Sequence, residues 1–143
     1  MLDTASFVTA VRSRLGAARE IVRLILSGEI IPLMDRKLSL EYRDVALRAE
    51  QLAASKTSKA EVLELIEAVE GFAESVEIVR KHRPLSPDPN DDMILDLAIN
   101  GQADVLVTNN TKHFIAAARR FGITVLTPAE MLRRMRKGEQ NGN

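Results

Sequence analysis

The apolar positions of the chain follow two spacings, one typical of helices and the other of buried strands. Apolar residues three and four apart, together with capping-box sequences, predict helices at residues 17–26, 38–52, 58–71, about 91–98, 112–120 and from 127 onward. The capping boxes are residues 58–61 and 127–130, in which a Ser or Thr is followed three positions later by Glu.

Short runs rich in β-branched apolar residues lie between these helices and predict strands at residues 30–34, 76–79, 105–108 and 123–126. Strands without a polar face are typical of a parallel sheet that helices cover on both sides. The pattern therefore predicts an α/β protein with three α/β/α layers and a central parallel sheet. Ligands of such sheets bind beyond the carboxyl ends of the strands.

Length and composition predict one domain and exclude several classes of site. The 143 residues are expected to form a domain over residues 1–137 and a disordered tail at residues 138–143. Cysteine is absent, which excludes disulfides, Cys-based zinc sites and a thiolate nucleophile and is typical of a reducing compartment. No apolar run approaches the ~20 residues of a membrane helix, and no secretory signal is visible. We therefore expect a cytoplasmic protein without a membrane partner.

Charge is balanced overall, with a net charge of zero, which differs from the composition of a strongly basic nucleic-acid binder. Two groups of basic residues stand out locally: Arg12, Arg14, Arg19 and Arg23, and then Arg133, Arg134, Arg136 and Lys137. Runs of charge are usually solvated helix faces, so both groups are expected to lie on the surface.

Acidic and amide residues follow the predicted strands and mark one edge of the sheet. Asp3 follows the first apolar residues, Glu41 lies on the helix after residues 30–34, and Asn110 comes just after residues 105–108. Asp91 and Asp92 begin a helix after a proline-rich loop. Crowded carboxylates repel one another unless a positive charge lies among them, and a hard divalent cation such as Mg²⁺ prefers oxygen ligands. The sequence predicts a divalent metal site at this edge.

Several motifs occur together in a specific order, although none is specific alone: residues 2–4 (LDT), 39–42 (SLEY), 88–95 (DPNDDMIL), 103–110 (ADVLVTNN) and 122–128 (GITVLTP). In this order and spacing they closely resemble the PIN domain, and within that family the toxins of bacterial and archaeal toxin–antitoxin systems. The resemblance covers residues 1–134, which is nearly the whole chain.

The resemblance implies a ribonuclease that depends on Mg²⁺ or Mn²⁺ and acts on an RNA substrate. It implies Asp3, Glu41 and Asp91 as acidic metal ligands, with Asn110 at a fourth position where many relatives carry a carboxylate. Supporting positions are Thr4, Thr108, Asp88 and Asp92. Such toxins usually form homodimers and are silenced by a cognate antitoxin protein, so both partners are expected here. Ala5 departs from the family, which usually has an amide residue at this position.

Each candidate residue also has a purely structural explanation. Asp3 and Asn110 are both suited to capping helices, Glu41 to a solvated helix face, and Asp91 to a favourable charge at a helix N-terminus. His113 lies past the motif in a short helix, and proximity to a motif is weak evidence for a role in the site. His82 lies in a basic run and is expected to be exposed.

Two alternative functions follow from the same residues. A catalytically silent PIN-like module that binds RNA or protein would explain Ala5. A phosphotransfer domain of the receiver or phosphatase type would also place Asp residues at strand ends, but it needs a lysine after a late strand, and Lys112 is the only candidate.

Overall fold

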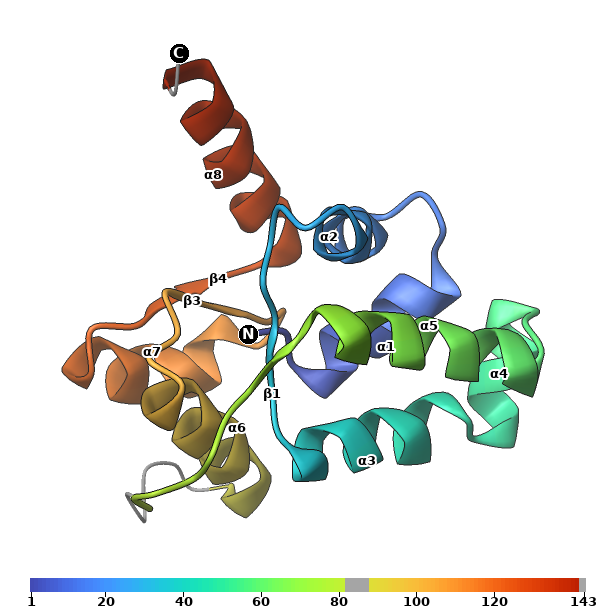
Figure 1. The fold of residues 1–143 in the computed structure, drawn as a ribbon, viewed down its shortest axis with the longest axis horizontal. Coiled ribbons are helices and arrows are strands. Elements are labelled where there is room, and N and C mark those ends of the chain that lie inside the picture. Colours follow the sequence, from blue (N-terminus) through green and yellow to red (C-terminus); the bar gives the residue numbers. More distant parts are fainter. Residues whose placement is uncertain (82–87, 142–143) are drawn as a thin grey trace.

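A computed structural model describes residues 1–81 and 88–141 of the chain. Its helices are α1 (Thr4–Arg12), α2 (Ala17–Leu26), α3 (Arg36–Ala46), α4 (Ala49–Ser55), α5 (Lys59–Phe72), α6 (Pro89–Asn100), α7 (Thr111–Arg120) and α8 (Pro128–Asn141) (Figure 1). Its strands are β1 (Leu33–Met34), β2 (Glu74–Ser75), β3 (Val105–Val107) and β4 (Thr124–Leu126). His82 and much of the proline-rich loop lie outside the described residues.

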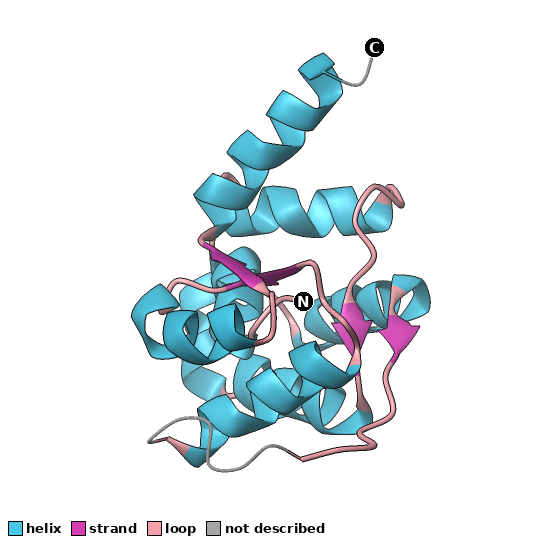
Figure 2. Ribbon diagram, turned by 90° about the vertical axis from the view of Figure 1, so that its left-hand side faces the viewer, coloured by secondary structure: helices cyan, strands magenta, loops and turns pink. Residues whose placement is uncertain are grey.

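All of the described strand pairs are parallel, as the sequence predicts. β1 pairs with β2 from Leu33 opposite Glu74, and β3 pairs with β4 from Val105 opposite Thr124. Leu2 adds a parallel bridge to Val107 on the other side of β3. β1 and β3 are buried, whereas both residues of β2 are exposed, and helices surround the short strands (Figure 2). The α/β class is therefore confirmed, with the parallel pairs arranged as two two-stranded sheets in the described part of the chain.

The core is built from aliphatic side chains of both helices and strands. Its fully buried members include Leu106 of β3, Leu95 and Leu97 of α6, and Ile66 of α5. Aromatic residues are few, but Phe7 of α1 is buried and stacks on the ring of Tyr42. None of the described helices is long and apolar enough to cross a membrane.

Local sequence signals predict several helix boundaries accurately. The helix at residues 17–26 matches α2, and Gly28 follows it with a φ of +83°, a left-handed conformation that glycine adopts without strain. At the first predicted capping box, Ser58 is the N-cap of α5 and accepts a hydrogen bond from the Glu61 backbone N–H (3.1 Å).

The second capping box, at the start of α8, is reciprocal. The Glu130 N–H donates to the Thr127 hydroxyl (3.2 Å), and the Thr127 N–H donates to the Glu130 carboxylate (3.0 Å). The hydrogen bond from the Thr127 backbone lowers the pKa of the Glu130 carboxyl, and that from the Thr127 side chain lowers it further. α8 then extends away from the rest of the molecule (Figure 1).

Two predicted segments, one helix and one strand, are divided or shorter in the structure. Residues 38–52 form parts of two helices, α3 and α4, because the backbone of Arg48 is extended and starts the second one, with no Gly or Pro to mark the break. The strand expected at residues 30–34 is limited to Leu33–Met34, directly after Pro32, which has no N–H to donate to a ladder.

Further differences concern β2, α1 and the end of α8. The strand expected at residues 76–79 lies two residues earlier, at Glu74–Ser75, where the Glu74 N–H donates to the Pro32 carbonyl (2.8 Å). α1 was not predicted, because residues 7–11 alone are too short and mixed to classify. α8 continues to Asn141, past the point after Lys137 where the sequence predicts a disordered tail.

Candidate functional site

Asp3 is buried where the first helix meets the end of β3. It is the N-cap of α1, and its Oδ1 accepts a hydrogen bond from the Ser6 backbone N–H (2.9 Å). Its other oxygen, Oδ2, accepts from the Thr108 hydroxyl (2.5 Å). Its backbone N–H donates to the Val107 carbonyl (3.2 Å), and only 6% of the residue is exposed. The carboxylate is therefore fixed at the carboxyl end of the strands.

Thr108 links Asp3 to Asn110. Its hydroxyl is fully buried, donates to Asp3 and accepts a hydrogen bond from the Asn110 backbone N–H (3.0 Å). Asn110 is exposed and occupies the N-cap position of α7, but its side chain makes no capping hydrogen bond. Its amide oxygen is therefore not committed to closing the helix, the structural role that the sequence suggested as an alternative.

Glu41 comes from α3, which packs against α1 through its neighbour Tyr42. The Tyr42 hydroxyl donates to the Leu2 carbonyl (2.5 Å), and its ring stacks on Phe7 with 4.4 Å between the centroids. Burial raises the pKa of Tyr42, and the negative charges of Asp3 and Glu41 raise it further. Glu41 itself is half-buried and adjoins Tyr42 in the chain.

Asp91 lies within the first turn of α6 rather than at its cap. Its backbone N–H donates to the carbonyl of Asp88 (3.1 Å), as does that of Asp92 (3.3 Å). The side chain of Asp91 is 16% exposed, and its Oδ2 lies 3.4 Å from Nδ1 of His113 on α7. Asp92 is buried and Asp88 is exposed. The sequence placed His113 past the site, whereas the fold brings it beside Asp91.

The candidate donors are chemically suited to a hard cation. Asp3, Glu41, Asp91 and Asn110 offer carboxylate and amide oxygens, and the Thr4 hydroxyl beside Asp3 is buried without a hydrogen-bond partner among the described residues. Over residues 1–81 and 88–141, no group of three His, Cys, Asp or Glu side chains could hold a metal ion by itself. Mg²⁺ usually keeps several waters and binds one or two carboxylates together with substrate phosphates, so the donor set fits such an ion.

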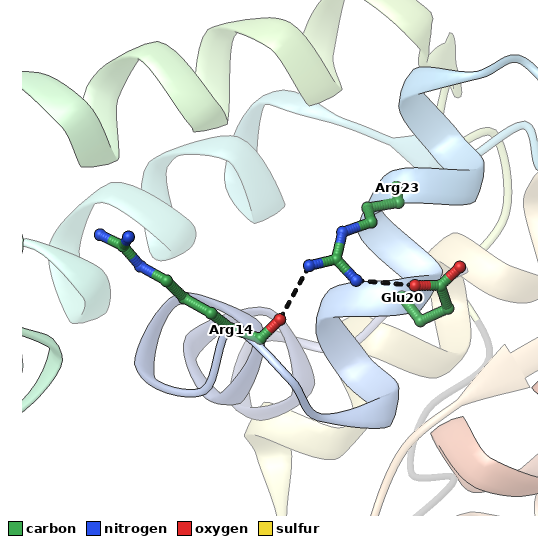
Figure 3. Close-up of polar contacts among 3 residues, drawn as sticks. All are labelled: Arg14, Glu20 and Arg23. Atoms are coloured by element: carbon green, nitrogen blue, oxygen red, sulfur yellow. Dashed lines mark hydrogen bonds and ion pairs between the residues drawn. The ribbon is translucent and has the colours of Figure 1, made fainter.

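The first group of arginines lies on α1, on α2 and in the turn between them, and the second group lies on α8. The exposed guanidinium of Arg23 donates to the Glu20 carboxylate (2.7 Å) and to the Arg14 carbonyl (2.9 Å). The Arg14 guanidinium points away from this contact (Figure 3). Burial lowers the pKa of Arg19, and the charges of Arg14 and Arg23 lower it further. Arg23 therefore ties α2 to the turn before it.

Sequence reasoning missed two contacts of this region because each joins residues distant in the chain. The Tyr42 hydroxyl bond to Leu2 spans 40 residues, and no local pattern signals it. The pairing of His113 with Asp91 depends on how α6 and α7 pack side by side. The only sequence signal for His113 is its position in the first turn of a helix that begins beside the predicted site.

Comparison with known proteins gives one match. A family model described as "PIN domain" matches residues 1–112, a segment that contains Asp3, Glu41, Asp91 and Asn110. No curated protein and no solved structure matches the chain.

Proposed function

The chain belongs to the PIN domain family, whose members are typically nucleases that use divalent metal ions, and from that premise we propose that it is a metal-dependent endoribonuclease. RNA is the proposed substrate, and Mg²⁺ or Mn²⁺ is the proposed cofactor. The family match leaves the phosphotransfer alternative without support.

The observation that carries this proposal is the state of the Asp3 carboxylate. Capping a helix requires only one oxygen, and Oδ1 serves that purpose through Ser6. The second oxygen is nevertheless buried and held by Thr108, in a residue that is only 6% exposed. Burying a charge is costly unless it is hydrogen-bonded or paired with a cation. The hydrogen bond to the second oxygen is not needed for the cap, and a carboxylate fixed in this way at the carboxyl end of the strands supports a cation site.

The proposed roles of the residues follow from their positions. Asp3, Glu41, Asp91 and Asn110 would hold the metal ion, which when bound supplies an activated water and stabilises charge on the phosphodiester oxygens. Thr108 orients both Asp3 and the backbone of Asn110 through its single hydroxyl. The buried Thr4 hydroxyl is a further polar group beside Asp3.

Beyond ribonuclease activity, we propose a specific biological role as the toxin of a toxin–antitoxin pair. The order of motifs resembles toxins of toxin–antitoxin pairs, so we propose a cognate antitoxin protein as a partner and a homodimer as the assembly. A neighbouring gene for a small DNA-binding protein, whose product blocks RNA cleavage when mixed with this chain, would support that role. Unimpeded cleavage in its presence would count against it.

A catalytically silent RNA- or protein-binding module is the second candidate. Ala5 favours it, because this exposed residue in the first turn of α1 has no polar group to orient Asp3 or a metal-bound water. Binding of RNA at micromolar concentration without turnover, and without uptake of metal at millimolar Mg²⁺, would identify a silent module.

The test of nuclease activity uses a mixed pool of labelled RNAs with Mn²⁺ or Mg²⁺. The wild type is compared with Asp91→Asn, with a chelator control, and with Asp44→Asn as a matched variant, because Asp44 is an exposed aspartate that pairs with Arg48. We expect cleavage by the wild type and by Asp44→Asn, and none with Asp91→Asn or chelator. Cleavage that survives both the chelator and the loss of Asp91 would refute the proposal.

A further inference from the structure

His113 is the one imidazole in the described part of the chain, and it contacts a candidate metal ligand from another helix. Its Nδ1 lies 3.4 Å from Oδ2 of Asp91. The Asp91 side chain is 16% exposed, whereas that of His113 is 59% exposed. The contact therefore lies at the rim of the site, with the carboxylate on its inner side.

The first turn of α7 connects this contact to Asn110. Asn110 is the N-cap position of α7, and its carbonyl accepts a hydrogen bond from the His113 backbone N–H (3.0 Å). The Asn110 N–H is in turn held by the Thr108 hydroxyl, which also holds Asp3. One series of hydrogen bonds therefore runs from Asp3 through Thr108 and Asn110 to His113, and the imidazole extends it to Asp91.

We propose that His113 is a positioning residue of the metal site, which holds the Asp91 carboxylate on α6 at a fixed separation from Asn110 on α7. The inference rests on the proposed function, because it concerns the ligands of that site. Two ligands on separate helices need a defined spacing, since misplacing such groups by about 1 Å is enough to impair a site. The contact supplies a direct side-chain link between the two helix starts.

The size of the effect on metal affinity distinguishes a positioning role for His113 from that of an ordinary surface ion pair. An exposed pair contributes little to stability, so its removal leaves the unfolding midpoint almost unchanged in either case. Groups that orient metal ligands, in contrast, typically change metal affinity or activity by about 10–100-fold when they are removed. Metal affinity is therefore the decisive quantity.

The experiment measures Mn²⁺ binding to the full chain by the loss of the free-ion signal in electron paramagnetic resonance. Three variants are compared with the wild type: His113→Ala, His113→Asn and Lys112→Ala. Asn keeps a side-chain N–H donor near the position of Nδ1, while Lys112 is an exposed neighbour in the same turn and serves as the control. Far-UV circular dichroism verifies that all variants are folded.

We expect His113→Ala to weaken Mn²⁺ binding by roughly 10–100-fold, His113→Asn to recover most of the affinity, and Lys112→Ala to match the wild type. RNA cleavage by His113→Ala should approach the wild-type rate when Mn²⁺ is raised to saturation. If the wild type binds Mn²⁺ and His113→Ala binds it equally well, the positioning role is overturned while the nuclease proposal stands. Equal losses in the Ala and Asn variants also overturn it. A wild type that neither binds Mn²⁺ nor cleaves RNA overturns both proposals.

Discussion

Replacing Thr108 with valine tests how the Asp3 carboxylate is held. Valine keeps the branched shape of threonine and removes only the hydroxyl, which in this fully buried residue donates to Asp3 (2.5 Å) and accepts from the Asn110 N–H (3.0 Å). The substitution therefore leaves a buried carboxylate oxygen without its donor and a backbone N–H without its acceptor.

The expected cost follows from these two groups. A hydrogen bond to a charged group contributes about 1.5–3 kcal/mol, and an ordinary one about 1 kcal/mol. Their sum predicts that Thr108→Val lowers the free energy of unfolding by about 3 kcal/mol. A domain of this size loses about 3–4 °C of melting temperature per kcal/mol, so the midpoint should fall by roughly 10 °C.

Urea denaturation followed by far-UV circular dichroism measures this difference, with Thr9→Val as the matched control. Thr9 is exposed on α1, and its hydroxyl donates only to the Ala5 carbonyl one turn earlier (2.9 Å). Its replacement should change stability by no more than about 0.5 kcal/mol. If Thr108→Val costs no more than Thr9→Val, the hydroxyl does not hold the buried carboxylate and the reasoning is refuted.

Three further predictions concern the fold around the site. Tyr42 is the sole tyrosine in a chain without tryptophan, so absorbance at 295 nm reports its ionisation alone. Folding raises the pKa of Tyr42, so the neutral phenol contributes fully to stability below the unfolded pKa of about 10, and this contribution is lost as the pH rises further. The phenolate should therefore appear together with alkaline unfolding. A phenolate that appears near pH 10 while the protein is still folded would contradict the burial of Tyr42. Leu106→Ala removes a fully buried side chain of β3 and should cost about 2–5 kcal/mol in urea denaturation, whereas a cost below about 1 kcal/mol would place this strand at the surface. Thr127→Ala removes the hydroxyl of the second capping box and should cost about 1 kcal/mol, with a loss of helical signal in circular dichroism; an unchanged spectrum and midpoint would mean that the box does not support α8.

The features that the sequence predicts well are those determined within a few residues. The capping boxes at Ser58 and Thr127, the helix Ala17–Leu26 and the left-handed Gly28 each depend on local backbone chemistry. The β-branched runs at β3 and β4 likewise identify buried parallel strands, so the α/β class follows from pattern alone.

The features that the sequence does not reveal arise from packing between distant segments. The break between α3 and α4 at Arg48 has no Gly or Pro signal, and the start of β1 depends on where Pro32 meets Glu74. As candidates for the site, Asp3, Glu41, Asp91 and Asn110 were predicted from their order along the chain. Their side-chain partners were not, because partners such as His113 are set by the approach of whole helices.

The central claim is that buried and half-buried carboxylates at this sheet edge bind a divalent metal. Calorimetric titration of Mn²⁺ into the wild type and Asp3→Asn tests it most directly, because asparagine is an equally good N-cap and preserves the start of α1 while removing the charge. We predict that the wild type binds Mn²⁺ and that Asp3→Asn, although equally folded, loses this binding. Equal binding by the two proteins would contradict the claim.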